Sequence, residues 1–157
     1  MVRYLYKKKQ MKQPAICKFI PFIAMMLAVI SGLAQTPQNW TSKQLMEPAD
    51  LAKTLQAGKD VPTIISIGPG APIPFSINVG MVNHTEGLDK LKKRLSTLPA
   101  QTNLVVYCGC CPFEHCPNVR PAIDLLKEMK FTSYHLLNLP VNIKTNWIDK
   151  GYPVNKP

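Results

Sequence analysis

Acidic residues are scarce in this sequence, and residues 1–34 contain none at all. The chain of 157 residues holds 19 lysines and arginines against nine aspartates and glutamates, a net charge of +10. Six of the basic residues lie in the acid-free segment, so the rest of the chain carries 13 basic against nine acidic residues, or +4. That remainder has no basic stripe with interleaved aromatics, the usual mark of a nucleic-acid-binding surface. We therefore expect no nucleic-acid partner.

Long apolar runs are also rare, and the most prominent one lies near the N-terminus. Residues 19–30, FIPFIAMMLAVI, follow a basic start and lead into the small residues Ser31, Gly32 and Ala34. A basic start, an apolar run and a small-x-small ending are typical of a secretory signal peptide. We interpret residues 1–34 as such a peptide.

Cleavage after Ala34 predicts where the protein works. It would leave a short linker, 35–39, and an exported protein, periplasmic or extracellular, where disulfides can form. Met11, which opens the sequence MKQ, is an alternative start. The second interpretation is an uncleaved membrane anchor, although an apolar stretch of about 16 residues is slightly short of a bilayer span. Membrane contact is expected only through such an uncleaved leader.

Internal repeats and low-complexity segments are absent from residues 40–155, which predicts one domain of ordinary globular sequence. Apolar spacing and turn residues predict strands and helices that alternate along the chain. The expected strands are 62–68, a short one around Ile77 and Val79, 103–107 and 133–139, and the expected helices are 47–58, 86–98, 121–129 and a short one within 142–154. This order indicates an α/β domain, with a parallel sheet of about five strands covered by helices on both faces.

Cysteine is confined almost entirely to one loop. Cys17 would leave with the leader, and the other four cysteines lie in YCGCCPFEHCPNVRP, residues 107–121, between a strand and a helix. The carboxyl ends of parallel strands carry the binding site in such folds. Unpaired N–H groups and the helix dipole stabilise a thiolate there, and Arg120 could hold an oxyanion. This layout predicts a nucleophilic cysteine. The atom that it attacks could be sulfur or phosphorus, because phosphatases use the same layout.

Four interpretations of the loop cysteines remain open at this point. They could form disulfide staples, although such short loops gain little stability from them. Cys108 and Cys111 have C-x-x-C spacing, which a dithiol redox pair would use, with Cys110 and Cys111 as resolving thiols. A metal site would use Cys108, Cys110, Cys111 and Cys116, with His115 as a further candidate, but C-x-C-C-x4-C is not a zinc-finger spacing. The fourth interpretation is sulfur transfer, for which we expect no metal and no cofactor.

The chain resembles the rhodanese family of single-domain sulfurtransferases, from about Trp40 to Val154. The resemblance rests on VVYC, on VRPAIDLLKEMKF, on APIPFSINV and on the ending WIDKGYPV. It implies a rhodanese-like fold in which Cys108 is the catalytic cysteine, Arg120 is the loop arginine and a persulfide carries the transferred sulfur. The implied partners are a small sulfur-donor anion such as thiosulfate and a thiol acceptor, and the loop residues Gly109, Asn118 and Val119 would contribute to the anion cradle.

Two departures from the family pattern concern the site. Eleven residues separate Cys108 from Arg120, where the family usually has four, and the additional residues include the other three loop cysteines. The acidic residue that commonly follows the second strand is missing, since that segment offers only Ser66. Cys116, four residues before Arg120, is therefore the alternative nucleophile.

Overall fold

The computed structural model describes residues 40–155 of the chain. The predicted signal peptide and linker, together with Cys17, lie outside the described residues.

Five short parallel strands form the central sheet, in the order β1-β5-β4-β2-β3. The strands are β1 Leu45–Met46, β2 Thr63–Ser66, β3 Ile77–Asn78, β4 Leu104–Tyr107 and β5 Tyr134–Leu137. β4 is the middle strand, and it pairs with β2 along its whole length and with β5 from Leu104 to Val106. All four residues of β4 are buried, as expected of a parallel strand covered on both faces. The predicted five-stranded parallel sheet is thus confirmed.

Helical segments connect these strands. They are η2 Ser42–Gln44, α2 Pro48–Ala57, α3 Thr85–Leu95, η3 Phe113–His115, α4 Val119–Glu128 and η4 Lys144–Ile148, the last a single π-helical turn. α2 shows how local sequence sets the bounds. Pro48 occupies the first helical position, where its missing N–H costs nothing, and Gly58 ends the helix with φ +61°.

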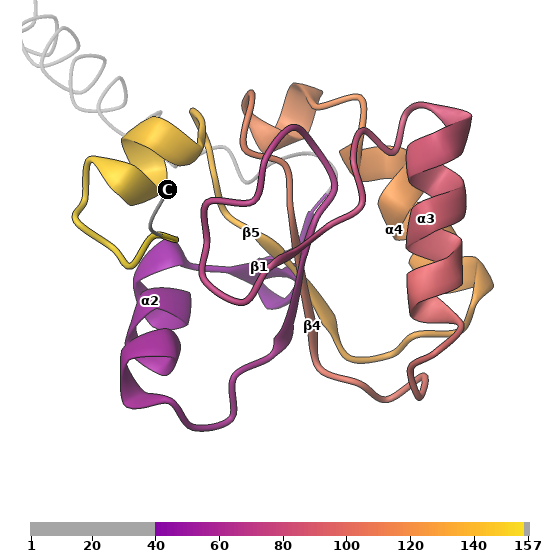
Figure 1. The fold of residues 1–157 in the computed structure, drawn as a ribbon, viewed down its shortest axis with the longest axis horizontal. Helices are drawn as coiled ribbons and strands as arrows, with labels where there is room; N and C mark the ends of the chain where they lie inside the picture. Colours follow the sequence, from indigo (N-terminus) through magenta and orange to yellow (C-terminus); the bar gives the residue numbers. More distant parts are fainter. Residues whose placement is uncertain (1–39, 156–157) are drawn as a thin grey trace, which may run out of the picture. The chain divides into compact units, whose positions relative to one another are not determined.

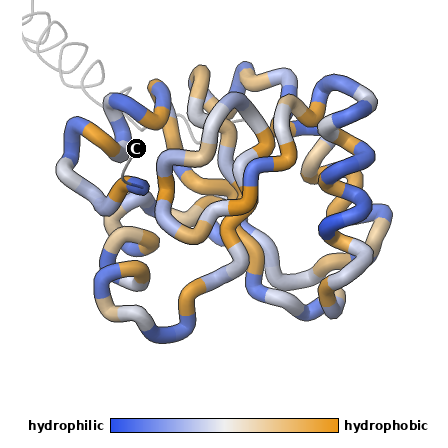
Figure 2. The backbone as a smooth tube through the Cα atoms, viewed as in Figure 1, coloured by the Kyte–Doolittle hydropathy of each residue, from blue (hydrophilic) through white to orange (hydrophobic). Residues whose placement is uncertain are grey.

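The helices cover both faces of the sheet (Figure 1). α3 and α4 pack on one face, where Leu91 and Leu126 meet Val106 in one hydrophobic cluster. On the other face, Leu51 of α2 and Trp147 of η4 belong to a second cluster, which includes alternate strand residues such as Val105. Hydrophobic residues accordingly concentrate along the central strands, while hydrophilic ones line the outer helices (Figure 2). The prediction of helices on both faces is confirmed.

Two features of the fold differ from the prediction. The helix expected at 121–129 begins earlier, at Val119, which brings its N-terminal end close to the cysteine loop. The edge strand β1 was not expected, because two residues carry no periodic pattern; it forms by pairing of Leu45 with Leu136 and of Met46 with Leu137 of β5.

Within residues 40–155, the helices are all too short or too polar to cross a membrane.

Candidate functional site

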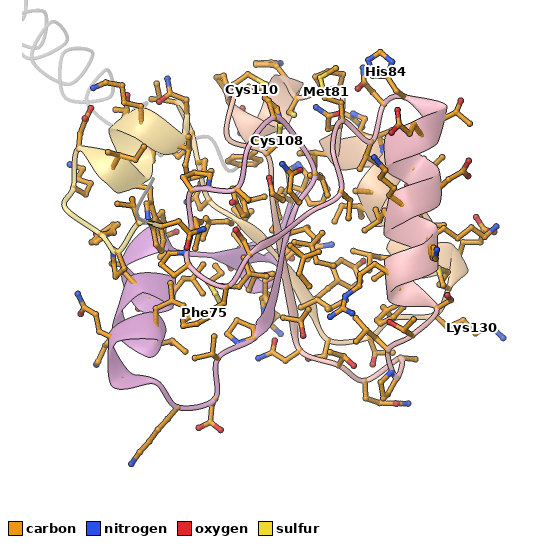
Figure 3. All side chains as sticks on the ribbon, viewed as in Figure 1. Phe75, Met81, His84, Cys108, Cys110 and Lys130 are labelled. Atoms are coloured by element: carbon orange, nitrogen blue, oxygen red, sulfur yellow. The ribbon has the colours of Figure 1, made fainter. Side chains whose placement is uncertain are left out.

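The site lies where the middle strand of the sheet ends. β4 stops at Tyr107, and Cys108 follows at once, so the strand delivers this cysteine to the carboxyl edge of the sheet. Figure 3 shows Cys108 and Cys110 close to each other beyond that edge. The loop then continues through η3 and enters α4 at Val119. This is the position that the sequence predicts for the chemistry.

Two glycines allow the backbone to approach closely here. A Cβ atom on Gly68, just after β2, would lie only 2.6 Å from Sγ of Cys108. A Cβ atom on Gly109 would lie 2.9 Å from the side chain of Ile143, and the carbonyl of Gly109 accepts a hydrogen bond of 2.9 Å from the N–H of Ile143. Any larger residue at either position must displace its neighbour.

The loop brings all four thiol groups together. Their sulfur atoms all lie within 4.8 Å of one another. Sγ of Cys110 lies 3.4 Å from Sγ of Cys108 and 3.3 Å from Sγ of Cys111, and all four are free thiols. Cys108 and Cys116 are buried, Cys111 is half-buried and Cys110 is exposed. The cluster therefore has two buried sulfurs and an opening to solvent at Cys110.

Asn118 supplies the principal polar contact to the buried sulfurs. Its Nδ2 lies 3.5 Å from Sγ of Cys108 and 3.8 Å from Sγ of Cys116. Its Oδ1 accepts a hydrogen bond of 3.0 Å from the backbone N–H of Asn83, which turns the NH₂ end of the amide toward the sulfurs. Two backbone groups contribute further hydrogen bonds. The N–H of Cys110 donates to the sulfur of Cys108, and the N–H of Asn118 donates to the sulfur of Cys116. The buried sulfurs thus face several fixed N–H donors.

These contacts separate the thiols by acidity. The hydrogen bond from the thiol of Cys108, followed by the N–H of Asn118, lowers the pKa of Cys116 to about 5 despite its burial. The same hydrogen bond and then burial raise the pKa of Cys108. Burial, and next the hydrogen bond with Cys110, raises the pKa of Cys111 to about 12. The directions of these shifts favour Cys116 as the thiolate of the cluster, with Cys108 as the thiol that donates to it.

Arg120 is not brought to the sulfurs. It is exposed on the first turn of α4, where it lines a surface cavity of about 210 Å³ with other residues of that helix and with Trp40 and Gln44. Among the described residues, the side-chain hydrogen bonds to the four sulfurs come from the cysteines and from Asn118. The role of Arg120 in anion binding stays a prediction.

The other predicted residues take different places. Gly109 and Val119 are buried at the two ends of the loop, and His115 is exposed at the end of η3. Ser66, which stands near the position of the family's acidic residue, is fully buried and donates a hydrogen bond of 2.6 Å to the carbonyl of Gly70.

Sequence reasoning missed two residues that shape the site, Gly68 and Asn83. Gly68 had a signal, since it is a glycine directly after a buried strand, a place where a backbone often passes close to another group. Asn83 had none, because it acts through its backbone N–H on Asn118, a residue far away in the sequence.

The fold is similar to that of solved rhodanese-like structures. A rhodanese-like domain from Anabaena sp. is 17% identical with a TM-score of 0.52, over 73% of this chain and 80% of that one. A single-domain sulfurtransferase from Saccharomyces cerevisiae is 17% identical with a TM-score of 0.50, over 71% and 95%. A protein from Bacillus halodurans is 14% identical with a TM-score of 0.54, over 87% and 84%.

No protein-family model matches the sequence, and no curated protein matches it significantly. The structural likeness at these identities establishes the fold alone. The chain has the rhodanese-like fold, as its sequence predicts.

Proposed function

We propose that the protein is a sulfurtransferase that carries a sulfane sulfur as a cysteine persulfide on the loop between β4 and α4. One observation carries the proposal: two buried sulfurs lie beyond the carboxyl end of β4 and face fixed N–H donors from Cys110 and Asn118. Such donors can stabilise both a thiolate and the negative charge of a persulfide. Export to the periplasm or the outside is part of the proposal and rests on the pattern of residues 1–34.

Cys116 is the favoured nucleophile, although the sequence placed Cys108 first. Cys116 accepts hydrogen bonds from the thiol of Cys108, from the backbone N–H of Asn118 and from the amide of Asn118. It also lies three residues before the first residue of α4, so the positive end of that helix is near. Cys108 then keeps its proton and donates it in a hydrogen bond to the thiolate of Cys116.

The reaction has two steps that balance in sulfur and charge. In the first, the thiolate of Cys116 attacks the outer sulfur of thiosulfate; a new S–S bond forms, the S–S bond of thiosulfate breaks, and sulfite leaves with the electron pair. In the second, a thiolate of the acceptor attacks the outer sulfur of the persulfide, and the thiolate of Cys116 leaves. The fixed amide of Asn118 stabilises the sulfur anions in both steps.

The test is intact mass spectrometry of the purified, reduced, metal-free protein before and after thiosulfate. We expect a gain of one sulfur atom that cyanide or a thiol removes, and peptide mapping should place it on Cys116. Cys116→Ser should abolish the gain, while His115→Ala, an exposed change in the same loop, should leave it intact. A reduced protein that gains no sulfur on any cysteine contradicts the proposal.

Thiol–disulfide exchange is the second candidate, favoured by the close approach of Cys110 to both Cys108 and Cys111. A disulfide between two of these thiols would need only a small movement of sulfur, since an S–S bond is about 2 Å long. Incubation in glutathione buffers, followed by thiol counting, tests it. A reversible loss of two thiols per chain is expected, and four thiols that stay free in oxidised glutathione would exclude this candidate.

A further inference from the structure

We propose that Cys108, Cys110, Cys111 and Cys116 bind a single thiophilic metal ion, with Zn²⁺ as the reference ion, in a tetrahedral site of four thiolates. This inference revises the expectation from sequence that no metal is held. It rests on the positions of the sulfur atoms and does not depend on the proposed sulfur transfer.

The distances between the sulfurs fit such a site. A Zn–S bond is about 2.3 Å long, so the sulfurs of a regular tetrahedral site lie about 3.8 Å apart. Here Sγ of Cys110 lies 3.4 Å from Sγ of Cys108 and 3.3 Å from Sγ of Cys111, and no pair of the four exceeds 4.8 Å. Movements of about 1 Å or less would complete the tetrahedron. Small side-chain rotations can supply movements of this size.

The donor set selects the class of metal. The four sulfurs form a candidate group by themselves, with no carboxylate or imidazole in it, and His115 is exposed outside the cluster. Thiolates favour soft and borderline ions such as Zn²⁺, Cd²⁺ and Cu⁺, whereas Mg²⁺ and Ca²⁺ require oxygen ligands. A closed set of four thiolates is also the arrangement found in structural zinc sites.

Residues around the sulfurs are placed to support the ligands. Four thiolates on a divalent ion carry a net charge of −2, which buried surroundings must offset with hydrogen-bond donors. The amide of Asn118 donates to Cys108 and Cys116, and it is itself oriented by the N–H of Asn83. Asn118 is only 2% exposed, so its donors have few competing partners in water.

The loop holds the four sulfurs in place at several points. It is fixed to β4 at one end and to α4 at the other. Between them, the N–H of Ile143 donates to the carbonyl of Gly109 at 2.9 Å, and the N–H of Phe113 donates to the carbonyl of Leu139 at 3.3 Å. The exposed Cys110 leaves a path for the ion from solvent. A cluster held in this way loses little chain entropy when the ion binds.

Metal binding and sulfur transfer would compete for the same thiols. An ion that takes Cys116 as a ligand removes the lone pair with which this sulfur would attack a donor. The bound metal would therefore hold the protein inactive until a chelator or a stronger thiol removes it.

The experiment is an anaerobic titration of the reduced, metal-free, full-length protein with Co²⁺, followed by displacement with Zn²⁺. We expect one ion per chain, thiolate-to-cobalt charge-transfer absorption, and the visible bands of a tetrahedral site. One equivalent of Zn²⁺ should bleach these bands and protect all four loop thiols from alkylation. Absence of tetrahedral bands overturns the proposal, and so does binding that leaves the loop thiols reactive.

Variants separate a built site from loose binding by surface thiols. Cys110→Ser changes an exposed side chain, so the fold should survive, and it should lose the four-thiolate spectrum. Asn118→Ala should weaken binding by about 10- to 100-fold, the usual effect of removing a supporting hydrogen bond. The matched control His115→Ala should bind as the unchanged protein does. Equal binding by all of these proteins overturns the proposal. The thiosulfate assay on metal-free protein is independent, so failure of one proposal is distinguishable from failure of the other.

Discussion

At the scale of single residues, Cys116 and its donors give the most direct test of the site. Because its pKa is lowered to about 5, Cys116 is already ionised well below neutral pH. In metal-free protein, its alkylation rate should change less than about twofold between pH 6.5 and 8.5, whereas a thiol with a pKa of about 8.5 would react about 50-fold faster at the higher pH. Peptide mass spectrometry after timed alkylation measures both rates.

The control for this prediction is Cys108→Ala, which removes the thiol hydrogen bond that contributes most to the lowered pKa of Cys116. Loss of that donor raises the pKa of Cys116, so a dependence on pH should return in part. A steep rise in the rate for the unchanged protein would contradict the assignment of Cys116 as the thiolate.

Gly68 gives a second prediction at this scale. Gly68→Ala places a methyl group 2.6 Å from Sγ of Cys108, closer than packing allows, and should destabilise the protein by about 1–3 kcal/mol. Urea denaturation measures the free energy of unfolding. Combining the change with Cys108→Ala removes the clashing sulfur, so the double variant should lose less stability than the two single losses added together. Simple additivity would show that the two positions do not interact.

The residue scale also shows where sequence reasoning reaches its limit. Cys108 could be placed at the end of a strand because VVY has the composition of a buried strand and the cysteine follows it directly. Gly68 lies against Cys108, and Asn83 donates to Asn118, in each case across a large distance in the sequence. Local sequence patterns do not predict such contacts. Arg120 was expected near the sulfurs from its place in a motif; its side chain lines a surface cavity with Trp40 and Gln44, and its role in anion binding stays a prediction.

At the scale of elements, α3 packs on the sheet through a leucine stripe that its sequence predicts. Leu91 and Leu95 are fully buried, while Lys92 and Lys93 are exposed. Leu91→Ala should lower the free energy of unfolding by about 2–5 kcal/mol, because it leaves a cavity between α3 and the sheet. Lys92→Ala, one position along the same helix, should change it by less than about 0.5 kcal/mol. Similar losses for both variants in chemical denaturation would contradict this packing.

Elements of sufficient length were predictable, and short ones only in part: β3 and η4 were expected, whereas β1 was not. The helical spacing of leucines in α3 and the β-branched runs of β2 and β4 each give a signal over several residues. β1 has two residues, which pair with Leu136 and Leu137 of β5. A segment this short has no periodic pattern from which a strand could be predicted. η4 was expected as a short helix; the structure shows it as a π-helical turn whose Trp147 is buried in the second core.

At the scale of the whole molecule, metal binding should couple to stability. An ion that binds only the folded chain adds about 2.7 kcal/mol when its concentration is 100 times the dissociation constant. Zn²⁺ should therefore raise the melting temperature of the unchanged protein, and a chelator should reverse the rise. Differential scanning calorimetry measures both. Cys110→Ser keeps three thiolates and should show a smaller increase, and an equal increase for this variant would contradict binding at the loop.

The place of β4 in the sheet has a mechanical consequence for the site. Hydrogen bonds to β2 and β5 hold this strand from both sides, so the backbone is fixed up to Tyr107, directly before Cys108. The segment from Cys110 to Cys116 lies outside the sheet, and its link to the chain after β5 is the hydrogen bond from the N–H of Phe113 to the carbonyl of Leu139. If the proposed site takes up an ion or a sulfur atom, we expect the side chains and the segment from Cys110 to Cys116 to move more than the backbone of β4 does.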